Sequence, residues 1–254
     1  MVRITLALAA SVFFALFAQA AQATPDETAL ALYNEGAFDA AADRAESIGD
    51  AENLALAARA LNAMAYLDDD DKRAKKTVKR SAKLADEASE LDPTLVEAYL
   101  QAAIAMAQRG SRMSAIKAFF NGLGPGARKR LDAALALEPE NPWALSTSAG
   151  WHLGVAARAG DGRFGADAAT GRAQFIAARA SDPENISIAY EMALRIIAFG
   201  EPAWREDALA SLDAAISNPA LTAFDAALQA RAQEFAAAIN DGPEAEAAFI
   251  EAQP

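Results

Sequence analysis

The residue types that could carry catalytic chemistry are scarce in this sequence. It contains no cysteine and a single histidine, His152, which excludes cysteine–histidine catalysis and metal sites rich in His or Cys. A serine–histidine–aspartate triad would have to use His152, which falls inside a predicted helix and has no nucleophile-elbow motif to serve. Acidic pairs are abundant, but they lie on predicted solvated helix faces, where they resemble solubility charges. We therefore predict no catalytic residue, no metal site, no cofactor and no enzymatic activity.

Four residues are candidates for a binding groove. Trp151 and His152 are neighbours, and a lone histidine beside a tryptophan is more often a packed, hydrogen-bonded residue than a ligand. Glu191 and Arg195 interrupt an otherwise apolar predicted helix, residues 184–199, and stand four residues apart in the favourable order. Because a helix that is apolar nearly all round is expected to be buried, the two charges must pair. The pair could be purely structural, or it could form a polar contact at the floor of a groove.

A predicted helix in the first half of the chain carries a basic face. Its basic residues recur at steps of three and four, which places them along one side of the helix: Lys72, Lys75, Lys76, Lys79, Arg80 and Lys83. The segment 72–130 holds 13 basic and 5 acidic residues, whereas the rest of the chain holds 10 basic and 30 acidic residues. This face could be a solvated surface, or it could be a docking strip for an anionic partner or for lipid headgroups.

The elements that would position these residues are predicted to be helices only. Apolar residues make up 53% of the chain but aromatics only 7%, so the core is built from Ala and Leu, and segments typical of strands do not occur. The chain also repeats a helix-ending turn with the prolines Pro93, Pro139, Pro183 and Pro219, each preceded at five residues by an alanine, Ala88, Ala134, Ala178 and Ala214. The proline spacings of 46, 44 and 36 residues are typical of stacked helix pairs. We predict an all-α fold, an α-solenoid of antiparallel helix hairpins.

In these positions the chain resembles the tetratricopeptide repeat (TPR) family, whose period is about 34 residues. The matching positions are the hairpin turn Gly36-Ala37-Phe38 with Ala41, the first-helix aromatic Tyr99, and the second-helix pair Phe175 and Ala178. The resemblance covers roughly residues 27–240 and implies a TPR-like fold that is degenerate and carries insertions. The longer first intervals indicate insertions at 111–126 and around 160–165.

A second resemblance is carried by Gly150-Trp151-His152 and the loop 160–165 that follows it. This combination is similar to exported TPR-like proteins, among them the T-component of TRAP transporters, a periplasmic helical protein paired with a substrate-binding protein. The resemblance implies an accessory role in transport. Known T-components are typically lipid-anchored, and this chain has no cysteine to anchor.

The first 23 residues have the pattern of a cleavable secretory signal peptide. Arg3 precedes the apolar run 6–17, and Ala21-Gln22-Ala23 is a small-x-small cleavage site, with Ala18-Gln19-Ala20 as a second candidate. The run is too short for a membrane span, and no later stretch is long and charge-free enough for one. We predict a periplasmic protein without a stable membrane span, with 24–254 as a single TPR-like domain and 243–254 as its C-terminal cap. The net charge of −12 argues against nucleic-acid binding.

Two functions remain open. The first is a non-enzymatic scaffold or adaptor whose concave groove holds a protein or peptide partner, such as a component of an envelope or transport complex. The alternative is an accessory component of a periplasmic transport system that binds a small molecule or lipid. A ligand binder predicts an enclosed apolar cavity near Trp151, the loop 160–165 and the loop 119–126, whereas a scaffold predicts an open groove.

Overall fold

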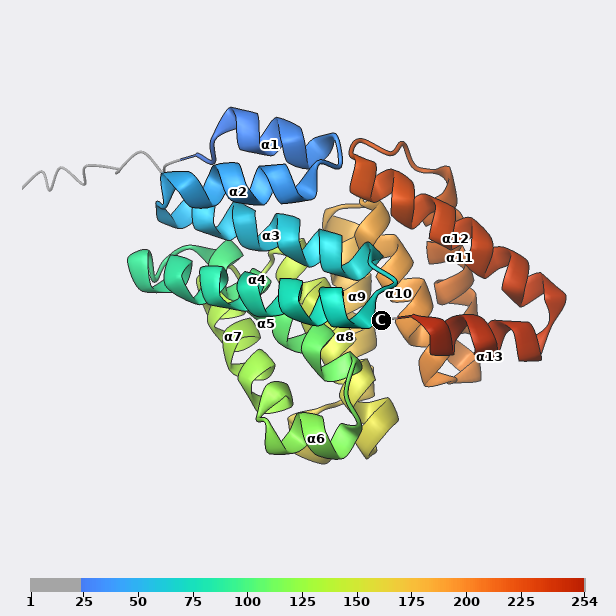
Figure 1. The fold of residues 1–254 in the computed structure, drawn as a ribbon. Coiled ribbons are helices and arrows are strands. Elements are labelled where there is room, and N and C mark those ends of the chain that lie inside the picture. The colour runs from blue at the N-terminus through green and yellow to red at the C-terminus, as the bar shows by residue number, and fades with distance from the viewer. Residues whose placement is uncertain (1–23, 254) are drawn as a thin grey trace, which may run out of the picture.

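A computed structural model describes residues 24–253 of the chain, and its regular elements are helices (Figure 1). In chain order they are α1 (Glu27–Asn34), α2 (Phe38–Ile48), α3 (Ala51–Leu67), α4 (Asp71–Leu91), α5 (Val96–Ser111), α6 (Ala115–Phe120), α7 (Leu123–Leu137), α8 (Pro142–Ala159), α9 (Ala168–Ser181), α10 (Ile186–Phe199), α11 (Arg205–Ser217), α12 (Ala223–Asp241) and α13 (Pro243–Ala252). Two short 3₁₀ helices, η1 (Arg163–Gly165) and η2 (Pro202–Trp204), lie between them. The predicted all-α fold is confirmed. The predicted signal peptide, residues 1–23, lies outside the described residues.

The helices begin where side-chain oxygens can accept from free backbone N–H groups. Asp50 caps α3, Asn141 caps α8 ahead of Pro142, and Asn185 caps α10. Thr222 begins α12 with a capping box, in which Asp225 accepts in return from the Thr222 backbone. Polar residues at these few positions therefore define where the helices begin.

The repeated proline turn has the same geometry at each occurrence. The residue before each proline donates its backbone N–H to the carbonyl of the alanine predicted to mark the turn: Asp92 to Ala88 at 2.9 Å, Glu138 to Ala134 at 2.9 Å, Asp182 to Ala178 at 3.0 Å and Asn218 to Ala214 at 2.9 Å. Ala88, Ala134 and Ala178 are fully buried, and Ala214 is partly buried. The spacing read from the sequence thus corresponds to one recurring helix end.

Helices pack as pairs, and the two insertions lie between the two helices of a pair, α6 between α5 and α7 and η1 between α8 and α9. The closest-packed neighbours are α3 with α4, α5 with α7, α8 with α9 and α10 with α11, the arrangement of a helical solenoid. Gly171 of α9 allows one such approach, because a Cβ at this position would lie 3.0 Å from the Cβ of His152 and 3.1 Å from the carbonyl oxygen of Ala149. The short helix α6 and the 3₁₀ helix η1 occupy the two predicted insertions.

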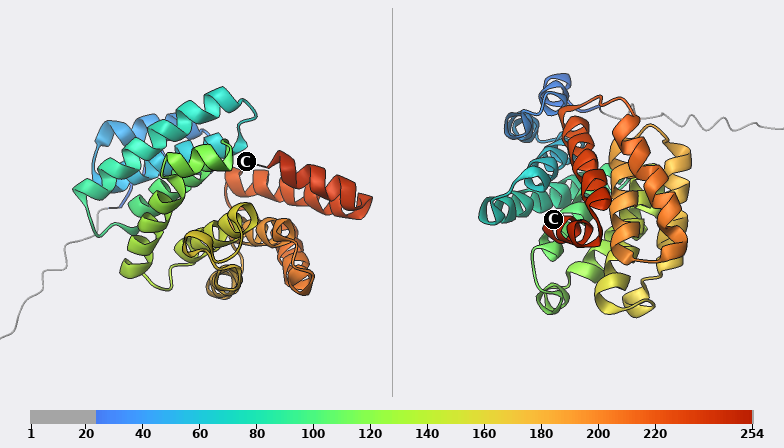
Figure 2. Two further views of the ribbon diagram at one scale, coloured as in Figure 1. Left: turned by 90° about the horizontal axis from the view of Figure 1, so that it is seen from below. Right: turned by 90° about the vertical axis from the view of Figure 1, so that its right-hand side faces the viewer.

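The first helices of successive pairs form an inner layer that closes into a ring. This layer consists of α1, α3, α5, α8, α10 and α12, each in contact with the next, and α12 returns to contact α1. Phe224 at the start of α12 packs edge-on against Phe38 and Tyr66, with ring centroids 6.4 Å and 6.0 Å away. Figure 2 (left) shows the elements following one another around this ring from blue through green and yellow to red. The ring brings helices that are far apart in sequence around one centre.

The C-terminal helix α13 packs back onto α12 and α10. Phe249 stacks on Phe235 with centroids 4.7 Å apart, and Gln253 accepts a hydrogen bond from the hydroxyl of the buried Tyr190 at 3.0 Å. Within the described part of the chain, none of the helices has the length and apolar character needed to cross a membrane.

Candidate ligand-binding pocket

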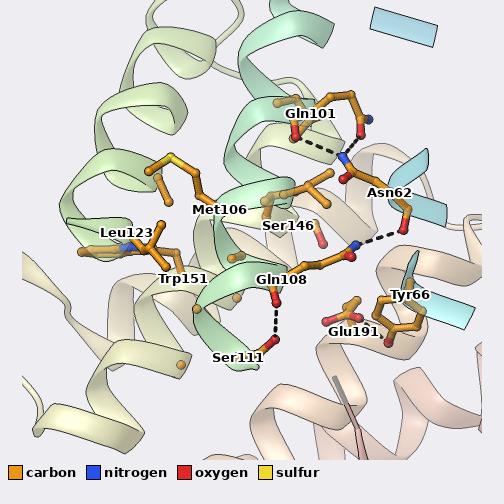
Figure 3. A pocket seen from close by; sticks show the side chains of 18 of the residues that line it. Asn62, Tyr66, Gln101, Met106, Gln108, Ser111, Leu123, Ser146, Trp151 and Glu191 are labelled. Atoms are coloured by element: carbon orange, nitrogen blue, oxygen red, sulfur yellow. Dashed lines mark hydrogen bonds between the residues drawn. The ribbon is translucent and has the colours of Figure 1, made fainter. Parts of the chain in front are cut away.

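The centre of the ring holds a pocket of about 400 Å³, which we call the central pocket. Side chains from α3, α5, α8, α10 and α12 line it, together with residues of α7 and the η1 segment. Figure 3 shows Met106, Leu123 and Trp151 on one side of this space, facing Asn62 and Tyr66 on the other. The pocket is partly open to the surroundings, so a ligand could enter without unfolding the ring.

The walls of the central pocket are mainly apolar. The apolar lining includes Leu100, Ile104, Leu123, Trp151, Val155 and Leu228. Trp151 is 8% exposed, and its indole Nε1–H donates to the carbonyl oxygen of Gly124 at 2.9 Å. This bond fixes the start of α7 against α8. A wall of this kind favours an apolar ligand, because burying apolar surface is the main source of affinity in such sites.

Missing side chains create much of the space. Gly150 and Gly154 are one turn apart on α8 and line the pocket, as does Gly124 at the start of α7. A Cβ built on any of these three glycines would meet no atom within 4 Å. Glycine inside a helix costs about 1 kcal/mol relative to alanine, so two such residues facing a void lower stability while leaving room for something else.

Two polar groups in the lining have no partner. Asn62 is satisfied, because its amide donates to Gln101 Oε1 at 2.8 Å and its Oδ1 accepts from Ser81 at 2.7 Å. Gln108 donates to the carbonyl of Asn62 at 3.1 Å, but its Oε1 accepts no hydrogen bond within the described structure. The hydroxyl of Ser187, in a residue that is 4% exposed, is likewise unpartnered there. A buried polar atom without a partner is costly, and one that lines a cavity can be satisfied by a ligand.

The predicted groove residues divide into two groups. Trp151, Glu191 and Arg195 all line the central pocket, whereas His152 does not. Glu191 and Arg195 form the ion pair expected from their spacing, with 3.0 Å between Oε2 and Nε, and Glu191 Oε1 accepts from the Tyr66 hydroxyl at 2.9 Å. Burial raises the pKa of Tyr66 well above its usual value, and the charge of Glu191 adds to the effect, so Tyr66 remains a neutral donor. The pair thus links α10 to α3 at the edge of the pocket.

His152 supports the helix packing around the pocket. Its Nδ1 accepts from the backbone N–H of Asp167, the N-cap of α9, at 2.9 Å. The guanidinium of Arg128 lies 2.6 Å from the other ring nitrogen and also packs over the indole of Trp151, 5.2 Å from its centroid. Burial lowers the pKa of His152, and the positive charge of Arg128 lowers it further.

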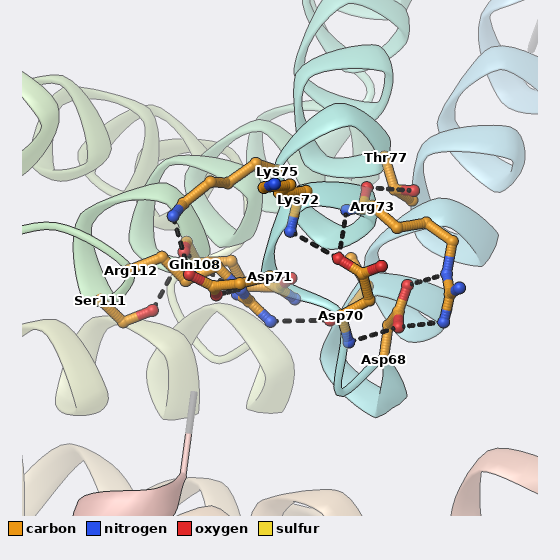
Figure 4. Close-up of polar contacts among 11 residues, drawn as sticks. Asp68, Asp70, Asp71, Lys72, Arg73, Lys75, Thr77, Gln108, Ser111 and Arg112 are labelled. Atoms are coloured by element: carbon orange, nitrogen blue, oxygen red, sulfur yellow. Dashed lines mark hydrogen bonds and ion pairs between the residues drawn. The ribbon is translucent and has the colours of Figure 1, made fainter.

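The basic face predicted on α4 lies on the outside of the ring, and none of its six residues lines the central pocket. Ion pairs occupy half of the face: Lys75 with Asp71 at 2.7 Å, Lys83 with Glu87 at 3.0 Å, and Arg80 with Asp43 and Glu46. Lys72, Lys76 and Lys79 are exposed and form no ion pair with any residue in the described range. Figure 4 shows the start of this helix, where Arg73 reaches back to Asp68 and Lys75 to Asp71.

Arg59 and Gly154 were missed at the level of sequence. Arg59 of α3 lines the pocket, with its guanidinium 4.8 Å from the ring centroid of Tyr33 and 5.9 Å from that of Trp143. The signal was available, because Arg59 is the only basic residue in the apolar run 53–67. Gly154 had a signal too, since it continues the small-residue side of α8 from Gly150.

Across the residues that the structure describes, no three His, Asp or Glu side chains gather closely enough to hold a metal ion.

No protein-family model matches the sequence, and no match is found among curated proteins. The resemblances to the TPR family and to the T-component therefore stay predictions.

Proposed function

We propose that this protein binds a small apolar molecule in the central pocket, of which the acyl chain of a lipid is representative. The volume of about 400 Å³ falls in the range of ligand sites, and the walls are apolar. The observation that carries the proposal is the pair Gly150 and Gly154, which leaves space where alanine would make a more stable helix.

Of the two functions that the sequence left open, the pocket supports the ligand-binding accessory of a transport system. The pocket lies beside Trp151, with Phe164 from the loop 160–165 and Leu123 and Pro125 from the loop 119–126 in its lining, which is the position expected for that function, although it is partly open rather than enclosed. Such an accessory would work in the periplasm beside a substrate-binding protein. Export would remove residues 1–23, and the mass of the mature protein, beginning at Thr24, tests this part of the proposal.

The pocket can be tested by filling it. Gly154→Leu projects a side chain into the space where no atom lies within 4 Å of the built Cβ. We expect the native protein to bind dodecanol and Gly154→Leu to lose that binding. Trp143 and Trp151 both line the pocket, so their fluorescence reports occupancy, and native mass spectrometry gives the stoichiometry.

Ala198→Leu is the matched control, because it adds the same side chain to an exposed position of α10 outside the pocket lining. This variant should bind dodecanol as the native protein does. Equal binding by Gly154→Leu and Ala198→Leu, with both variants folded, would place the ligand elsewhere and refute the proposal.

The exposed face of α4 supports a second role, docking of an acidic protein partner. The supporting observation is that three lysines of this face, Lys72, Lys76 and Lys79, form no ion pair within residues 24–253 and lie on a helix outside the pocket. Reversing Lys76 and Lys79 to Glu should abolish capture of the partner by crosslinking while helicity by circular dichroism stays unchanged. If the variant and the native protein give the same crosslinks, the partner does not dock at this face. The pocket proposal would be unaffected.

A further inference from the structure

The starts of the inner helices converge on one end of the central pocket. Glu97, Trp143 and Phe224 are each the second residue of their helices, α5, α8 and α12, and all line the pocket. Arg59 connects them, because its guanidinium lies over Trp143 and its charge interacts with those of Glu97 and Asp225. Helix N-termini carry partial positive charge, so this end combines several positive dipole ends and one full cation with the carboxylates of Glu97 and Asp225.

Arg59 interacts with the Tyr33 hydroxyl, and within the described residues its guanidinium keeps more N–H donors than this one acceptor can take up. Its side chain is partly buried, and its guanidinium has the rings of Tyr33 and Trp143 nearby. Within residues 24–253 no carboxylate lies within ion-pair distance of it, and the carboxylate of Glu97 accepts instead from Gln101 at 3.0 Å. A guanidinium has five N–H donors in one plane, and stacking on an aromatic face leaves those donors directed outward.

The two other arginines that line the pocket are paired or exposed, whereas Arg231, outside the lining, has a buried Nη1 without a hydrogen-bond partner in the described structure. Arg195 pairs with Glu191 at 3.0 Å, and Arg112 donates to the carbonyl of Ala65 at 2.7 Å. Arg158 lines the pocket as well, but it is exposed and reaches the carbonyl of Gly110 at 3.5 Å. Water solvates an exposed guanidinium at little cost, whereas a partly buried one between aromatic rings gains more from a ligand oxygen.

The hydroxyl of Ser187 is an independent sign of a polar ligand group. This residue is the second of α10, lines the central pocket, and is 4% exposed without a hydrogen-bond partner in the described structure. A purely apolar occupant would leave both this hydroxyl and the remaining donors of Arg59 unsatisfied. A ligand that carries oxygen acceptors at one end of an apolar chain would satisfy such groups.

We propose that the ligand is an apolar chain ending in a carboxylate, and that Arg59 holds this carboxylate through paired N–H donors. This inference rests on the proposed function, because it names the class of molecule that the same pocket takes. Arginine binds carboxylates in a bidentate manner, which neither lysine nor a neutral side chain reproduces. The carboxylates of Glu97 and Asp225 lie beside the site, and their negative charges weaken the binding of an anion.

The test compares dodecanoate with dodecanol, two probes that share a chain and differ in their head group. We expect the native protein to bind dodecanoate more tightly than dodecanol, and Arg59→Met to weaken dodecanoate binding by about tenfold or more while dodecanol binding holds. Glu97→Gln should strengthen dodecanoate binding, because it removes one of the opposing charges. Arg44→Met, which deletes an exposed arginine of α2 outside the pocket lining, should change neither affinity.

The outcomes separate this inference from the function on which it rests. If both probes bind equally well, or if Arg59→Met keeps the preference for the acid, the carboxylate anchor is wrong and the apolar pocket stands. If Arg158→Met, rather than Arg59→Met, loses the preference for dodecanoate over dodecanol, the carboxylate lies near Arg158. That result would overturn its assignment to Arg59. If neither probe binds the native protein, both proposals fail. Thermal melting checks that Arg59→Met folds, and if it does not, the response of Glu97→Gln to dodecanoate decides.

Discussion

At the scale of single residues, His152 illustrates how an isolated histidine serves the fold. A neutral imidazole can accept a hydrogen bond only through its unprotonated nitrogen. The Asp167 N–H lies 2.9 Å from Nδ1 and the Arg128 guanidinium 2.6 Å from Nε2, so both ring nitrogens face donors and the neutral ring can accept from only one of them at a time. Protonation would remove that acceptor, beside the positive charge of Arg128. The ring is thus held neutral while it orders the start of α9.

This arrangement makes stability depend on pH in a defined window. The pKa of His152 is lowered in the folded protein by burial and by Arg128, whereas the unfolded chain has the ordinary value of about 6.5. As pH falls below that value, the unfolded state binds the proton first, so the free energy of unfolding decreases. Above it, the contribution is fully present. Urea titrations at a series of pH values between neutral and mildly acidic should show this decrease.

His152→Asn is the control for this dependence. Asparagine can offer its Oδ1 to the Asp167 N–H but does not titrate, so we expect its unfolding free energy to stay flat across the same window. The carboxylates of Asp26 and Asp167 do not interfere, because hydrogen bonds from their partners lower their pKa values below the usual 3.8 and shift their effect to more acid pH. Parallel loss of stability in both proteins would show that another group is responsible.

The sequence predicted part of the site at this scale. Trp151, Glu191 and Arg195 could be predicted because an aromatic or charged side chain in an apolar helix indicates a specific contact. All three line the pocket. Arg59 obeys the same rule within α3 and could have been found by it. What the sequence could not indicate is that α3 and α10 face each other, since a sequence separation of 125 between Tyr66 and Glu191 leaves no local signal.

At the scale of elements, glycines in neighbouring helices have opposite roles. Gly171 of α9 permits close packing, because a Cβ there would lie within 3.2 Å of three atoms of α8. Gly154 of α8 faces open space in the pocket. The same substitution at the two positions therefore separates the cost of helical glycine from the benefit of close approach.

Gly154→Ala should raise the free energy of unfolding by about 0.5–1 kcal/mol, the gain in helix propensity. Gly171→Ala should lower it by roughly 1–3 kcal/mol, because the overpacked contact outweighs the same gain. Both values can be measured by urea denaturation at neutral pH. A stabilising Gly171→Ala would mean that α8 and α9 can move apart freely, contrary to the contact described here.

The helix hairpins could be predicted because their signals are local. Proline, the preceding alanine and the capping residues Asn141, Asn185 and Thr222 each act within one turn of the chain. The curvature of the stack has no such local source. It accumulates from small rotations between pairs, and a modest change in each rotation separates an open groove from a closed ring.

At the scale of the whole molecule, closure of the ring depends on a few contacts between the first and last inner helices. Phe224 of α12 packs against Phe38 of α2 and Tyr66 of α3, and Ala223 lies against Gly36 at the first hairpin turn. Gly36 adopts a φ of +85°, and a Cβ there would come within 2.8 Å of the Cβ of Ala223. Because α12 supplies one wall of the pocket, we expect the pocket to depend on this junction.

Phe224→Ala should therefore open the ring as well as weaken it. We expect a loss of about 2 kcal/mol in unfolding free energy, below that of a fully buried phenylalanine because Phe224 is only partly buried. Small-angle X-ray scattering should show a larger radius of gyration, and dodecanol binding should weaken because the apolar wall moves away from the rest of the pocket.

Phe199→Ala is the matched control. Phe199 is also partly buried, but it stacks on Trp204, with ring centroids 5.4 Å apart, and lies away from the junction. It should lose stability without changing the radius of gyration. If both variants scatter alike, the junction does not hold the ring closed, and the pocket must owe its shape to the stacking of the pairs alone.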